Sequence, residues 1–196
     1  MDRLINRIKG ETVYILGAGP SMDSISHEFF KRKITMGING VFERFPCVYS
    51  VMKHNEFLEK AKGATIRIAS EYDRGVQGGK RNGAEHIFKT IEPHIVKEPF
   101  KHIKLQILDD ERISVGYSTV ISAIDIARKM GAKMIILCGI DCEFDGDRMN
   151  FDGYFRETPI DPVKYKQLLD ITKDQIKTFS KHLKGKGVSV FYLKQA

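Results

Sequence analysis

The 196-residue chain is 42% hydrophobic and carries 32 basic against 25 acidic residues, which gives a formal net charge of +7. This length and composition suffice for a buried core within one domain. No apolar run is long enough to cross a membrane, and the charged start MDRLINRIKGE lacks the apolar stretch of a secretory signal. We therefore expect no membrane span, and a soluble, cytoplasmic protein.

The positive charge favours a polyanionic ligand, such as a nucleotide or a phosphosugar. The lysines are scattered and no nucleic-acid-binding motif is recognised, which argues against nucleic acid as the partner. The three cysteines cannot all pair with one another, and Cys138 and Cys142 lack a nearby histidine that would complete a zinc site. We expect buried thiols.

Short apolar, β-branched runs along the chain predict strands. They are residues 12–16, 33–38, 47–52, 64–69, 134–140 and 188–193. Several are almost continuously apolar, which is typical of parallel strands that are covered on both faces.

Segments with helical periodicity lie between these strands, at residues 25–31, 119–130 and 162–183. Gly131 ends the second, and Pro162 and Gly185 bound the third. The alternation predicts an α/β fold: a single-domain, Rossmann-like, doubly wound, mostly parallel sheet with helices on both faces. Two long stretches without a strand or helix pattern, residues 72–83 and 142–161, are typical of lids or binding loops.

A glycine-rich turn, Gly17 to Ser21, follows the first predicted strand. In a parallel sheet the ligand crevice lies beyond the carboxyl ends of the strands, so this turn is expected at the site. Its glycines permit close approach of a ligand, and the amides that follow Pro20 would form an anion pocket with the Ser21 hydroxyl. The alternative is a tight strand-to-helix turn that Ser21 caps. Neither standard phosphate motif applies, because Met22 replaces the third glycine and no Lys-Ser/Thr follows.

The stretch VYILGAGPSMDSI resembles the G-x-G-P-S loop of the bacterial sialyltransferases of the GT42 type and of the DUF115 group. That group includes motility accessory factors and archaeal 6-hydroxymethylpterin pyrophosphokinase-like (MptE-like) proteins. A second segment, SVGYSTVISAIDIARKMGAKMIILCGID, is similar to the second signature of these families, and GINGVF resembles the strand end whose Asn reads the nucleotide.

This resemblance implies a Rossmann-like transferase that binds a nucleotide-activated donor. The nucleotide-binding residues it implies are Gly17, Ala18, Gly19, Pro20, Ser21, Asn39, Ser114, Gly116, Ser118, Thr119 and Gly139.

The chain departs from the sialyltransferases after Gly-Ile-Asp. Those enzymes place a catalytic histidine there, whereas residues 142–161 of this chain contain none. His54, which follows a predicted strand, is our first candidate for the base. Tyr154 and Tyr165 are candidates for the tyrosines that hold donor phosphate, with Arg156 neutralising its charge.

The carboxylates of this region have several interpretations. Asp141 is a catalytic candidate, or it orients the loops by accepting backbone amides. Asp145 and Asp147 are candidate ligands for Mg²⁺, or they form a hydrated acidic turn. Lys80 and Arg81 lie on a glycine-flanked loop that either closes over phosphates or is solvated.

Three functional hypotheses remain. The first is a glycosyltransferase that uses a CMP-sialic-acid-like donor in surface glycan synthesis, with a glycan acceptor. The second is a Mg²⁺-dependent pyrophosphokinase that acts on a pterin-like alcohol with ATP, and the third is a non-catalytic nucleotide- or glycan-binding module. A homo-oligomer could supply a missing catalytic residue from a second subunit.

Overall fold

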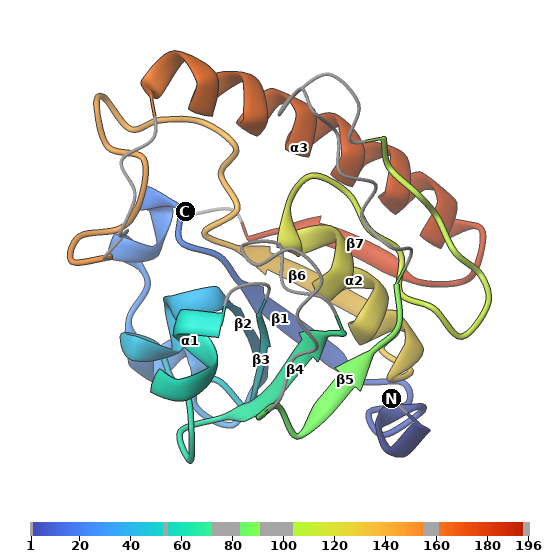
Figure 1. Ribbon diagram of the computed structural model, residues 1–196. Helices are drawn as coiled ribbons and strands as arrows, with labels where there is room; N and C mark the ends of the chain where they lie inside the picture. Colours follow the sequence, from blue (N-terminus) through green and yellow to red (C-terminus); the bar gives the residue numbers. More distant parts are fainter. Residues whose placement is uncertain (1, 53–54, 72–82, 91–103, 155–160, 194–196) are drawn as a thin grey trace.

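The computed structural model describes residues 2–52, 55–71, 83–90, 104–154 and 161–193. Its centre is a seven-stranded, all-parallel sheet with the strand order β5-β4-β3-β2-β1-β6-β7 (Figure 1). The strands are β1 (Thr12–Leu16), β2 (Ile34–Ile38), β3 (Tyr49–Met52), β4 (Ile66–Ser70), β5 (His86–Phe88), β6 (Met134–Cys138) and β7 (Ser189–Tyr192). The predicted α/β, Rossmann-like fold is confirmed.

The order of the strands reverses between β1 and β6. From β1 the chain adds β2 to β5 on one side, then returns through α2 (Thr119–Lys129) to place β6 on the other side of β1. In register, Thr12 lies beside Met134 and Leu16 beside Cys138. Such a reversal leaves a crevice at the carboxyl ends of the two strands, because the connections from them run to opposite faces of the sheet.

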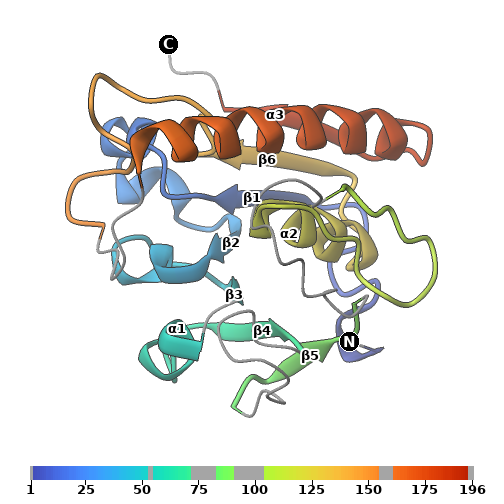
Figure 2. The same cartoon turned by 45° about the horizontal axis from the view of Figure 1, so that its top comes forward.

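One face of the sheet is covered by α2 and by α3 (Pro162–Lys184), which lie across it in Figure 2. Every α2 residue from Thr119 to Ala127 is buried. The long helix α3 buries only one stripe, which includes Leu168, Ile176, Phe179 and Leu183. Ile176, Phe179 and Leu183 join side chains of β1, β2, β3 and β6 in the largest core cluster, as the periodicity of both segments predicts.

The other face is covered by short elements. They are the 3₁₀ helices η2 (Pro20–Ser24), η3 (His27–Phe30) and η4 (Asn39–Glu43), together with α1 (Asn55–Lys60). The single helix predicted at residues 25–31 is therefore wrong. Ile25 and Ser26 are extended, and the Ser26 hydroxyl accepts a hydrogen bond from the Phe29 amide and starts a new turn.

Two side chains of this segment pack into the core. Met22 and Phe30 are both buried in a second core cluster, with Leu16, Phe45 and Phe151. The extended residues Ile25 and Ser26 lie between them, so the tertiary structure overrides the local helical pattern.

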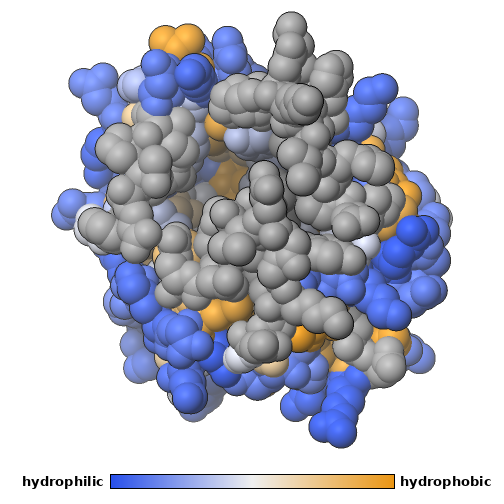
Figure 3. Space-filling view, in the orientation of Figure 1, coloured by the Kyte–Doolittle hydropathy of each residue, from blue (hydrophilic) through white to orange (hydrophobic). Residues whose placement is uncertain are grey.

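A further, shorter 3₁₀ helix, η1 (Asp2–Leu4), precedes β1. In the space-filling view the rim of the molecule is largely hydrophilic, with smaller hydrophobic patches (Figure 3). Across the described part of the chain, no helix combines the length and the apolar character that a membrane crossing requires.

Candidate functional site

The exits of β1 and β6 lie side by side at the carboxyl edge of the sheet. The parallel hydrogen bonding continues beyond both strands, since the Gly17 amide donates to the Cys138 carbonyl at 2.8 Å and the Gly19 amide to the Gly139 carbonyl at 2.7 Å. The two signature segments of the sequence therefore meet at the point where the strand order reverses. This is the place at which doubly wound proteins bind ligands.

The close packing of the two strand exits against each other requires glycine at these positions. A Cβ on Gly17 would lie 2.4 Å from the Gly139 carbonyl oxygen, and one on Gly19 would lie 2.4 Å from Asp141 Oδ2. Gly139 has a φ of +62°, and a Cβ there would lie 2.2 Å from Met22 Cγ. The glycines thus let two backbone turns interlock, whereas the sequence suggested that they make room for a ligand.

Asp141 closes the first turn, residues 17–21, by accepting two hydrogen bonds from Ser21. Its Oδ2 accepts a hydrogen bond from the Ser21 amide at 2.9 Å, and its Oδ1 accepts a second one from the Ser21 hydroxyl. The two residues are 120 positions apart in the sequence. The expectation that the amides after Pro20 are open to an anion is therefore wrong for Ser21, and the Gly19 amide is paired as well. Of the two interpretations of Asp141, the acceptor of backbone amides is the one that the contacts match.

A second turn, residues 114–118, precedes α2 and lies at the same edge of the sheet. The far end of α2 is fixed near the start of β1, because the Lys129 and Met130 carbonyls accept hydrogen bonds from the Asn6 and Ile8 amides. The opposite end of α2 therefore points towards the carboxyl edge. Ser118 caps it by accepting a hydrogen bond from the Val120 amide.

Two amides of this turn, those of Ser114 and Tyr117, also donate hydrogen bonds to protein side chains. The buried Ser114 donates its amide to Asp125 Oδ2 at 2.7 Å, and its hydroxyl accepts from the Leu108 amide at 2.9 Å. The Tyr117 amide donates to Gln175 Oε1 on α3 at 2.8 Å. A Cβ on Gly116 would lie 2.4 Å from the same oxygen. Ser114 and Gly116 thus shape the turn through contacts with α2 and α3.

Other predicted residues lie at this edge in different settings. Asn39 follows β2, the neighbour of β1, and has a left-handed backbone with a φ of +52°. Cys142, directly after Asp141, also has a positive φ, of +53°. Such conformations are uncommon outside glycine and gather at functional sites. Thr119, the first residue of α2, is buried.

The tyrosines predicted to hold phosphate have aromatic neighbours. The ring of Tyr154 meets that of Phe151 edge-on, with centroids 5.1 Å apart. The ring of Tyr165, near the start of α3, is stacked on Phe144 at 5.8 Å. His54, Lys80, Arg81 and Arg156 lie outside the described residues.

An ion-pair network ties the segment after Asp141 to the first turn. Asp23 of η2 accepts hydrogen bonds from Arg44 Nη1 at 2.7 Å and Arg148 Nη1 at 2.9 Å, and the Asp152 amide donates to it as well. Partial desolvation raises the pKa of Asp23, but these hydrogen bonds outweigh it and leave that pKa below its ordinary value. Arg148 also pairs with Asp145. The network is a structural clamp beside the site.

The predicted metal ligands differ in their partners. The Asp145 carboxylate faces Arg148, which is a cation, and Asp147 is exposed. In the described part of the chain, no three or more His, Cys, Asp or Glu side chains are grouped so that they could hold a metal ion.

Sequence reasoning missed Gln175 and Asp125, the two side chains that hold the second turn. Asp125 is fully buried on α2 and also accepts a hydrogen bond from Arg128 Nε at 2.7 Å. A polar residue within a buried helical stripe was the available signal for both, because burial of such a group requires a partner.

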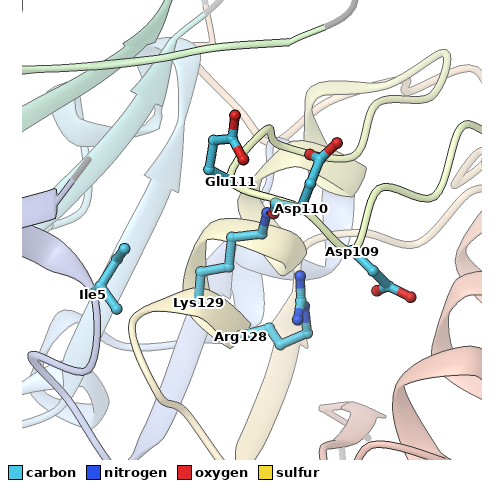
Figure 4. A pocket seen from close by; sticks show the side chains of 6 residues that line it. All are labelled: Ile5, Asp109, Asp110, Glu111, Arg128 and Lys129. Carbon is cyan, nitrogen blue, oxygen red and sulfur yellow. The ribbon is translucent and has the colours of Figure 1, made fainter.

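A surface pocket of about 180 Å³ lies at the other end of α2. Figure 4 shows its lining, with Lys129 reaching towards Asp110, whose carbonyl oxygen accepts a hydrogen bond from Lys129 Nζ at 2.5 Å. The other lining residues are Ile5, Asp109, Glu111 and Arg128. The pocket is separated from the strand exits by the length of α2.

Comparison of the sequence with protein-family models gave no match, and neither the curated proteins nor the solved structures gave a significant one.

Proposed function

We propose that this protein is a nucleotide-dependent transferase, a glycosyltransferase that uses a CMP-sialic-acid-like donor in surface glycan synthesis. One observation carries the proposal. The two sequence signatures resembling those of such enzymes meet on the adjacent strands β1 and β6, and Ser21 and Asp141 are hydrogen-bonded to each other there. The net charge of +7 is consistent with a phosphorylated ligand.

The proposal does not rely on free amides in the first turn, since Gly19 and Ser21 donate to protein atoms. Ligand contacts would instead come from groups around this junction. Asn39 at the end of β2 and Thr119 at the start of α2 are the described side chains we assign to them. His54 as the base and Arg156 as the partner of phosphate remain part of the proposal.

The reaction we propose is displacement at the anomeric carbon of the donor sugar. A base removes the proton from the acceptor hydroxyl, the oxygen forms the new glycosidic bond, and the nucleotide leaves with the phosphate oxygen and its electron pair. Proton removal by a positioned base and stabilisation of the leaving phosphate are the two contributions that the protein must supply.

A thermal-shift panel tests the proposal. CMP, UDP, GDP, ADP and ATP would each be added at about 1 mM, with and without Mg²⁺, because a ligand that binds only the folded state raises the melting temperature. We expect CMP to raise it without Mg²⁺, and CMP-sialic acid to be hydrolysed slowly. The absence of any shift with CMP and with its sugar conjugate would overturn this function.

A second candidate is Mg²⁺-dependent pyrophosphoryl transfer from ATP to a pterin-like alcohol. The observation that favours it is the row of carboxylates after β6, Asp141, Glu143, Asp145 and Asp147. In that case ATP should bind only with Mg²⁺, and Asp145→Asn should abolish this binding while the fold is retained. A binding module without catalysis, the third candidate, would bind a nucleotide or glycan and turn over no activated donor.

A further inference from the structure

We infer that Asp141 is a positioning residue of the proposed site: it holds the exit of β1 in shape, and its charge keeps ligand phosphate away from that turn. This inference rests on the proposed function. It differs from the sequence-based expectation, in which the first turn binds the phosphate directly.

The geometry shows how the carboxylate acts on the turn. Asp141 Oδ2 lies 2.9 Å from the Ser21 nitrogen, and Asp141 Oδ1 accepts a hydrogen bond from the hydroxyl of the same serine. Both donors that Ser21 would offer to a phosphate are thus directed at one side chain. The fit depends on Gly19, because any Cβ there would lie 2.4 Å from Asp141 Oδ2.

The contacts leave the charge of Asp141 in place. Its two partners in Ser21 are a neutral amide and a neutral hydroxyl, so the hydrogen bonds stabilise the carboxylate but do not neutralise it. Within the part of the chain that the structure describes, Asp141 forms no ion pair, whereas the neighbouring carboxylates Asp23 and Asp145 are each paired with an arginine.

Both signs of charge lie near this position. Burial raises the pKa of the neighbouring Cys142 thiol, and among the described residues Lys173 opposes this shift whereas Asp141, Glu143 and Asp170 add to it. A phosphate placed at Ser21 would face Asp141 within a few ångströms, and like charges in contact disfavour binding. The phosphate of a bound nucleotide should therefore lie away from Ser21.

Isothermal titration with CMP and with ADP tests the inference in the wild type and in three variants. Ser21→Ala removes a hydroxyl that a phosphate would need, and Asp141→Asn removes the charge but keeps an acceptor for the Ser21 amide. Asp152→Asn is the matched control, since it removes an exposed carboxylate from the same segment.

We expect Ser21→Ala to lower the melting temperature but to leave the Kd of the nucleotide within about twofold of the wild-type value, because no phosphate contact is lost. Asp141→Asn should lower the Kd by about three- to tenfold, since the repulsion is removed. Asp152→Asn should leave the Kd within about twofold, because its carboxylate is solvated and screened. A merely structural role of Asp141 would not tighten binding.

Two results would overturn the inference. One is a tenfold weaker Kd for Ser21→Ala with an unchanged melting temperature, which would place the phosphate at Ser21. The other is weaker or unchanged binding by a folded Asp141→Asn variant. If Asp141→Asn does not fold, the Ser21→Ala titration decides alone.

Failure of the proposed function has a different signature, because the wild type would then not bind CMP. The positioning role is still measured in that case by a double-mutant cycle on stability. Ser21→Ala should lower the urea midpoint of the wild type, yet lower it no further in an Asp141→Ala background. Additive losses would show that the two side chains act independently, and the positioning role would be wrong.

Discussion

Replacing Gly19 by alanine tests whether the glycines of the first turn serve to join β1 to β6. Gly19 has a φ of −68° and a ψ of 156°, a conformation that any residue adopts. An alanine in such a conformation would ordinarily stabilise a protein by about 0.4–1 kcal/mol, because the unfolded chain loses freedom. A gain in stability on Gly19→Ala would therefore indicate that backbone preference dominates, and a loss would indicate that packing dominates.

The packing predicts a loss. The new Cβ would lie 2.4 Å from Asp141 Oδ2 and 2.7 Å from the Gly139 carbonyl oxygen. Backbone cannot move aside easily, so the carboxylate must shift and weaken its bonds to Ser21. Overpacking costs about 1–3 kcal/mol, and a hydrogen bond to a charged group contributes about 1.5–3 kcal/mol. We expect a net loss of about 3 kcal/mol, or about 6–12 °C in melting temperature for a chain of this size.

The assay is thermal and urea unfolding followed by circular dichroism, with Gly185→Ala as the control. Gly185 has a helical φ of −64°, and a Cβ there would lie 3.3 Å from the nearest atom, the His182 carbonyl oxygen. We expect this variant to change stability by less than about 1 kcal/mol. A Gly19→Ala protein that melts at or above the wild-type temperature would refute the packing argument.

Three further predictions concern buried and paired groups. Asp125→Ala should lower the free energy of unfolding by about 3–5 kcal/mol in urea titrations, since it leaves the partly buried Arg128 without its carboxylate and the buried Ser114 amide without its acceptor; a loss below about 1 kcal/mol would contradict this. The side-chain hydrogen bond from Arg67 lowers the pKa of Glu85 to about 2, so its stabilisation is complete above the ordinary carboxyl pKa of 4.5 and is lost as the pH falls towards about 2. Because Glu85 is 42% exposed and screened, we expect only a modestly smaller drop in the urea midpoint between about pH 5 and pH 2.5 for Glu85→Gln than for the wild type, and equal drops would refute the coupling. Burial raises the pKa of the Cys47 and Cys138 thiols to about 12, so both should react with a thiol reagent at about pH 8 only after unfolding; rapid labelling of the folded protein at either cysteine would show otherwise.

Local pattern was enough to predict most of the sheet. The first predicted strand has the bounds of β1, and the runs at residues 33–38, 47–52, 134–140 and 188–193 each contain an observed strand. The run at residues 64–69 covers β4 except for its last residue, Ser70. Continuous apolar runs predict buried parallel strands because both faces of such strands are covered. β5 was missed, since its three residues carry too little pattern, and the six-residue helix α1 was missed as well.

The two longer helices were also predicted, for a related reason. The periodicity at residues 119–130 and 162–183 is sustained over several turns, and glycine follows each helix. The segment after Pro20 has no such support. Met22 and Phe30 of this segment pack into a core cluster that forms only when the sheet is assembled. The structure of the segment therefore depends on tertiary contacts.

The sequence by itself determined the strands, the long helices and the two glycine-containing segments that follow or precede them, because these features depend on near neighbours in the chain. Only the tertiary structure decided which groups meet. It paired Ser21 with Asp141 and Tyr117 with Gln175. The sequence alone does not show that these amides have partners within the protein. Hydrogen-bond partners are fixed by positions in space within a few tenths of an ångström, and no local pattern specifies such a distance between residues so far apart along the chain.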